Sequence, residues 1–87
     1  MDVEFTKAIE DIFKFVGSQE NILSVGRCKT RLRLNLKDNK KVDVGRFKNV
    51  EGVLGIVETK EQVQIIIEPP KANELIQKFK KAYEINK

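Results

Sequence analysis

The chain of 87 residues has no histidine, a single cysteine and no long apolar run. The missing histidine excludes a Cys-His nucleophile pair and any metal site built on imidazole. One cysteine excludes an internal disulfide and a Cys/His zinc cluster of any spacing. The longest uninterrupted apolar run, Ile65-Ile66-Ile67, is far shorter than the roughly 20 residues of a spanning helix, so we expect no direct membrane insertion.

Composition indicates one ordinary soluble domain that spans residues 1–87. The 40% of hydrophobic residues suffices for one core, and the 34% of charged residues is not typical of a disordered chain. Asp2 and Glu4 stand where a signal peptide would be basic, so we expect no such peptide. The net charge of +4 fits an acidic or phosphorylated partner and also weak nucleic-acid binding.

Apolar residues that recur at steps of three and four predict three helices. They cover residues about 3–16, a short stretch around Phe47 that Asp43 can cap, and residues 70 to about 84. The predicted element order is α-β-β-α-β-β-α, which indicates the α+β class.

Short apolar or alternating segments predict four strands, at residues 22–25, 31–37, 53–58 and 62–67. In the second of these, leucines at every second position oppose polar side chains that include Arg31 and Arg33. We expect a four-stranded, mainly antiparallel sheet with helices packed on one face. The charged face of the second strand then remains open to water or to a partner.

The only cysteine, Cys28, lies between four cations near the tip of a hairpin predicted for residues about 21–37. These cations are Arg27, Lys29, Arg31 and Arg33. Positive charge favours the thiolate, which is the nucleophilic form of the side chain. The same cations, with the hydroxyl of Thr30 and the backbone amides of the tip, are suited to bind a phosphate. Free cysteines are most often buried and inert, but the charge pattern and the hairpin position favour a reactive thiol.

The hairpin resembles the signature of the EIIB domain of the bacterial phosphotransferase system (PTS), in the glucose–sucrose class. Residues 28–33 read Cys-Lys-Thr-Arg-Leu-Arg and match the family pattern Cys-x-Thr-Arg-Leu-Arg. Leu36-Lys37-Asp38 matches the Leu-Lys-Asp that follows it, and Asn21-Ile22 matches the Asn-Ile that precedes it. The resemblance covers roughly residues 20–79 and agrees with the predicted element order.

The resemblance implies a protein-cysteine phosphotransferase that needs no cofactor and no metal. In this family the cysteine accepts a phosphoryl group from a phosphohistidine of a IIA protein or domain. It then passes the group to a sugar bound by the membrane-embedded IIC permease domain. Cys28 would be the phosphocysteine nucleophile, with Arg31 and Arg33 as the arginines needed for transfer and Thr30 as the hydroxyl beside the phosphate. The implied location is cytoplasmic, as a domain of an inner-membrane permease or docked on it.

Three positions depart from the common family pattern. Arg27 and Lys29 stand where many members have histidine and alanine, and Glu68 stands where many have glycine. The two extra cations favour phosphate binding, so we assign Arg27 and Lys29 to the phosphate site as well. Glu68 would repel a phosphate if its carboxylate lay near the thiol.

Two alternatives stay open from the sequence. A stand-alone EIIB-like domain could serve as a regulatory phosphoacceptor, because that role uses the same thiol chemistry. A small basic RNA-binding domain is less favoured, because sheet-based RNA readers place aromatic side chains on the open face and the predicted strands contain none. We therefore expect no nucleic-acid partner. The sequence does not identify the sugar, the oligomeric state or a longer parent chain.

Overall fold

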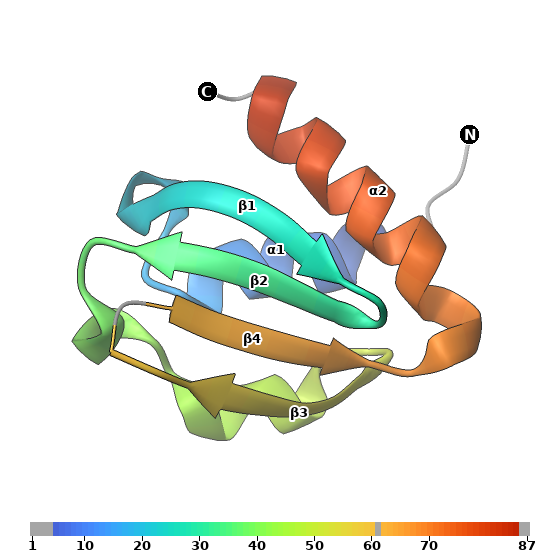
Figure 1. Cartoon of the computed structure of the whole chain (residues 1–87), viewed down its shortest axis with the longest axis horizontal. Coiled ribbons are helices and arrows are strands. Elements are labelled where there is room, and N and C mark those ends of the chain that lie inside the picture. Colours follow the sequence, from blue (N-terminus) through green and yellow to red (C-terminus); the bar gives the residue numbers. More distant parts are fainter. Residues whose placement is uncertain (1–4, 61, 86–87) are drawn as a thin grey trace.

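The computed structural model describes residues 5–60 and 62–85, which form a sheet covered on one face by helices (Figure 1). The four strands of this part are β1 (Ile22–Cys28), β2 (Arg31–Leu36), β3 (Val53–Glu58) and β4 (Gln62–Ile67). They lie in the order β1-β2-β4-β3, and every neighbouring pair is antiparallel. The predicted α+β class, the antiparallel sheet and the helices on one face are confirmed.

Two α-helices, α1 (Thr6–Phe15) and α2 (Pro69–Ile85), lie on the covered face of the sheet (Figure 1). Three short 3₁₀ segments complete the described chain: η1 (Gln19–Asn21), η2 (Asn39–Lys41) and η3 (Val44–Asn49). Neither α-helix, as far as the structure describes the chain, is long and apolar enough to cross a membrane.

The core lies between the helices and the leucine face of β2. Alternate side chains of β2 and β4 are buried there, namely Leu32, Leu34, Leu36, Val63, Ile65 and Ile67. The helices add their own apolar stripes, and the Phe13 ring of α1 stacks on the Phe79 ring of α2 with centroids 4.6 Å apart. The opposite face of the sheet therefore carries the polar side chains of β2 and the glutamines of β4.

The first helix begins later than predicted among the described residues, at Thr6, and residues 3 and 4 of the predicted range lie outside those described. It ends near Gly17, as expected, because Gly17 adopts φ +94°. A Cβ at this position would lie 2.7 Å from the Cβ of Lys41, so a side chain meets both backbone strain and a clash.

Two local predictions were wrong in detail. We expected the first strand to end at residue 25 with a turn at Gly26, but β1 continues to Cys28 and Gly26 pairs with Arg33 of β2. Glycine is common in turns, which is why a turn was expected at Gly26. The pairing with β2 that keeps Gly26 in the strand cannot be predicted from neighbouring residues alone. Asp43 makes no side-chain cap for η3, because its carboxylate pairs with Arg46 at 3.1 Å.

Candidate functional site

The signature hairpin places Cys28 at the exposed tip of the sheet. Cys28 is the last residue of β1, Arg31 is the first of β2, and Lys29-Thr30 forms the turn between them (Figure 1). The two strand ends are direct cross-strand partners. Their side chains therefore leave the same face of the sheet, with Cβ atoms about 5 Å apart. This face is the one that the helices do not cover.

A shallow pocket of about 430 Å³ contains the thiol. It is lined by Cys28, Lys29, Thr30, Arg31, Arg33 and Gln64. Five of the six residues that the sequence assigned to the site thus meet in one hollow. A thiol, cationic groups and a hydroxyl thus share one space, and this combination is suited to bind an anion.

Both pocket arginines are held by glutamines of the neighbouring strand β4. Arg31 donates from Nη1 to Oε1 of Gln64 at 3.0 Å, and Arg33 donates from Nε to Oε1 of Gln62 at 3.2 Å. Gln64 donates in turn to the same Oε1 of Gln62 at 2.9 Å. A guanidinium has five N–H donors, so a single bond to an amide orients the group and leaves it able to bind an oxyanion.

The glutamines belong to a polar ladder that crosses the open face. Gln62 donates to Oδ1 of Asn35 at 3.1 Å, and Asn35 donates to Oγ of Ser24 at 2.7 Å. Sequence reasoning gave these glutamines no role. Their alternation with buried aliphatic residues predicted that they face away from the core. The strand order β1-β2-β4-β3, which places them beside the arginines, could not be predicted from the sequence.

Gly26 leaves free space beside Arg33. It is the cross-strand partner of Arg33, and a Cβ built on it would have no other atom within 4 Å. A neighbouring hollow of about 260 Å³ opens there, lined by residues that include Gly26, Arg33 and Gln62. Arg33 therefore lines both this hollow and the pocket that contains the thiol.

Arg27 occupies a different place from the other predicted site residues. Its guanidinium donates from Nη1 to Oδ1 of Asn73 on α2 and from Nη2 to the carbonyl oxygen of Lys29, both at 2.7 Å. Arg27 does not belong to the lining of the pocket that holds Cys28. Successive side chains of a strand point to opposite faces, so Arg27 and Cys28 diverge at the end of β1.

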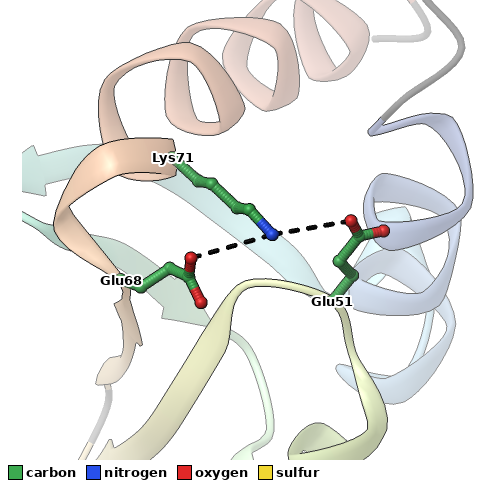
Figure 2. A network of polar contacts seen from close by, with 3 residues as sticks. All are labelled: Glu51, Glu68 and Lys71. Carbon is green, nitrogen blue, oxygen red and sulfur yellow. Dashed lines mark ion pairs between the residues drawn. The ribbon is translucent and has the colours of Figure 1, made fainter.

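Glu68 is engaged in an ion-pair network at the junction of β4 and α2. Figure 2 shows the Lys71 ammonium between the carboxylates of Glu68 and Glu51, at N···O distances of 3.7 and 3.6 Å. The backbone N–H of Glu68 also donates to the carbonyl of Gly52 at 2.9 Å. The lining of the thiol pocket does not include Glu68. Its carboxylate thus pairs with Lys71, which offsets the charge that could repel a phosphate.

Comparison with known proteins gives a consistent result. The family model described as phosphotransferase system, EIIB, matches residues 10–43. The N-acetylmuramic acid-specific EIIBC component of Pasteurella multocida (strain Pm70) is 42% identical over 72 residues, which cover 83% of this chain and 15% of that protein. The sucrose-specific EIIBC component of Bacillus subtilis (strain 168) is 31% identical over 85 residues, or 98% of this chain and 18% of that protein.

A solved structure agrees with the fold over most of the chain. The crystal structure of one domain of the PTS system IIabc component from Clostridium difficile superposes with a TM-score of 0.76 at 30% identity. The match covers 84% of this chain and 76% of that one. The chain spans less than a fifth of the length of the two curated relatives, so its counterpart in them is a single part of a larger protein. On these matches, the chain belongs to the EIIB family of the phosphotransferase system.

Proposed function

We propose that residues 1–87 form one EIIB-type domain that carries a phosphoryl group on Cys28. The donor is a phosphohistidine of a IIA protein or domain, and the acceptor is a sugar bound by a membrane IIC permease. The observation that carries the proposal is the exposed thiol of Cys28 in a pocket with two oriented arginines. The curated relatives are EIIBC components, which supports a C component as partner and a position on the cytoplasmic side of a permease.

The first transfer forms a phosphocysteine. The thiolate of Cys28 attacks the phosphorus of the phosphohistidine, an S–P bond forms as the P–N bond breaks, and the imidazole nitrogen keeps the electron pair and takes a proton. In the second transfer a sugar hydroxyl attacks the same phosphorus. The S–P bond then breaks, the thiolate is regenerated, and the hydroxyl proton passes to a base in the sugar site of the permease.

The pocket residues stabilise the charge of the transferring group. The planar guanidinium groups of Arg31 and Arg33 can each donate paired hydrogen bonds to two phosphoryl oxygens, and they are permanently charged. Lys29 adds a point charge, and the hydroxyl of Thr30 with the turn amides adds neutral donors. These groups act by positioning and electrostatic stabilisation, which dominate catalysis of phosphoryl transfer.

The test is phosphorylation of the chain by a phosphorylated IIA protein, followed by intact-mass analysis under conditions that preserve phosphocysteine. We expect the wild type to gain one phosphoryl group and Cys28→Ser to gain none. Because Cys28 is exposed, the serine variant should keep the thermal unfolding midpoint of the wild type, which shows that the loss is chemical. Phosphate on the serine variant would overturn the assignment of the acceptor.

A second stage separates the transport role from the regulatory one. The phosphorylated chain is mixed with membrane vesicles that contain IIC permeases and with labelled sugars. A carrier loses its phosphate as sugar phosphate forms. Retention of the phosphate with every permease and sugar tried would contradict the carrier function and favour a regulatory phosphoacceptor. An RNA-binding role receives no support, since the four described strands contain no aromatic side chain to stack on bases.

A further inference from the structure

Arg27 connects the turn beside Cys28 to the helix layer. Its two donor groups reach Oδ1 of Asn73 and the carbonyl oxygen of Lys29 at the same distance, 2.7 Å. Asn73 lies in the first turns of α2, whose start is fixed by the bonds from the N–H groups of Lys71 and Ala72 to the carbonyl of Glu68. One planar guanidinium thus ties a two-residue turn to a folded helix.

The bond to Lys29 fixes the orientation of a peptide group. Arg27 leaves β1 on the side opposite Cys28, so the Lys29 carbonyl that it binds is turned toward the helix-covered side. None of the described peptide bonds is cis. In a trans peptide the carbonyl and the following N–H point in opposite directions, so the N–H of Thr30 is directed toward the side where the thiol lies.

The turn needs such support because its backbone is unusual for its sequence. Lys29 has φ +53°, in the left-handed region that favours glycine. A residue with a Cβ is strained there and tends to relax into other turn conformations unless its surroundings hold it. In relaxed conformations the Lys29–Thr30 peptide rotates, and the Thr30 N–H no longer faces the thiol.

We propose that Arg27 is a positioning residue for phosphoryl transfer, which acts by clamping the Lys29 carbonyl so that the Thr30 N–H donates to the phosphoryl group on Cys28. The inference rests on the proposed function of Cys28. It assigns Arg27 a role other than direct phosphate binding, and Asn73 becomes its anchor. It also accounts for an arginine directly before the nucleophile in this chain.

The experiment compares Arg27→Ala and Asn73→Ala with Lys37→Ala as a matched control. The control removes one exposed cation at the opposite end of the hairpin. Steady-state transfer from phosphorylated IIA should show kcat lowered about 3- to 10-fold in Arg27→Ala and by a smaller factor in Asn73→Ala, with KM for IIA unchanged in both. Lys37→Ala should match the wild type in kcat.

A second readout does not depend on the transfer reaction. In unphosphorylated protein the three-bond HN–Hα coupling of Lys29 reports φ, and the amide shift of Thr30 reports the peptide orientation. We expect both to change in Arg27→Ala and Asn73→Ala and to stay unchanged in Lys37→Ala. If the wild type accepts no phosphate, the proposed function fails, while these NMR values still decide whether the clamp exists.

Two results would overturn the inference. An unchanged Lys29 coupling and Thr30 shift in Arg27→Ala would show that the turn needs no clamp. The second result is that Arg27→Ala loses transfer while Asn73→Ala keeps the wild-type kcat, Lys29 coupling and Thr30 shift. This result would show that Arg27 contacts the phosphate directly.

Discussion

The two ends of the β1–β2 hairpin use polar side chains in opposite ways. At the base, Asn21 is 3% exposed and its amide makes three hydrogen bonds, to the carbonyls of Val16 and Asp38 and from the N–H of Asp38. At the tip, Cys28 is exposed and lies in an open pocket with Arg31. Both ends belong to the segment that resembles the signature of the family, and we propose chemistry for the tip alone.

The difference separates folding from function within one motif. A buried amide whose donors and acceptor are all satisfied stabilises the fold, because breaking those bonds leaves polar groups buried without hydrogen-bond partners. Exposed cations around a thiol contribute little to stability, since solvent screens them, but they remain able to bind an anion. Substitutions at the base should therefore change unfolding, and substitutions at the tip should change transfer.

The largest effect is expected at the base. Asn21→Ala removes the three hydrogen bonds of a buried amide and leaves partners unsatisfied, so the free energy of unfolding should fall by ~3 kcal/mol. Urea titration followed by circular dichroism measures this value. The matched control is Asn35→Ala on the open face, where the amide is exposed and the loss should stay below ~0.5 kcal/mol. Equal losses in the two variants would contradict the structural role of the base.

A smaller effect, confined to transfer, is expected at the tip. Arg31→Lys and Arg33→Lys keep the charge but lose the planar fork, so each should slow phosphorylation of Cys28 by about 10- to 100-fold. Stopped-flow or quench-flow measurement with phosphorylated IIA gives the rate, and circular dichroism should show an unchanged fold. Wild-type rates in both variants would show that the guanidinium groups of these arginines are not needed for transfer.

The smallest effect is expected in the ladder that supports the arginines. Gln64→Ala removes the acceptor that orients Arg31, so transfer should slow by about 2- to 5-fold with little change in unfolding free energy. Gln19→Ala is the control, because this amide binds the carbonyl of Tyr83 and does not line the thiol pocket. If Gln64→Ala transfers as fast as the control, the orienting bond does not contribute.

Most of the fold was predictable because its signals are local. The period-2 pattern of β2 and β4 and the apolar stripes of α1 and α2 each identify an element from neighbouring residues alone. The closeness of Cys28 to Arg31 was predictable for the same reason, since a tight turn brings the two residues together whatever the rest of the sheet does.

The missed features depend on long-range packing. Gln62 and Gln64 reach the arginines only because β4 lies beside β2, and that neighbour relation comes from the sheet order. Arg27 is adjacent to Cys28 in sequence, yet it lies on the other face of the sheet, where it donates to Asn73, 46 residues away. The side chains of adjacent strand residues leave opposite faces, so neighbours in sequence such as Arg27 and Cys28 need not share a pocket.

Phosphorus NMR of the phosphorylated chain identifies the atom to which the phosphoryl group is bonded. A phosphoryl group bonded to sulfur resonates apart from one bonded to nitrogen or to a hydroxyl oxygen, so the spectrum identifies the linkage without proteolysis. After treatment with phosphorylated IIA, the account predicts one protein-bound resonance of the S–P type, absent from Cys28→Ser. A resonance of any other linkage in the wild type, or the same protein-bound resonance in Cys28→Ser as in the wild type, would contradict it.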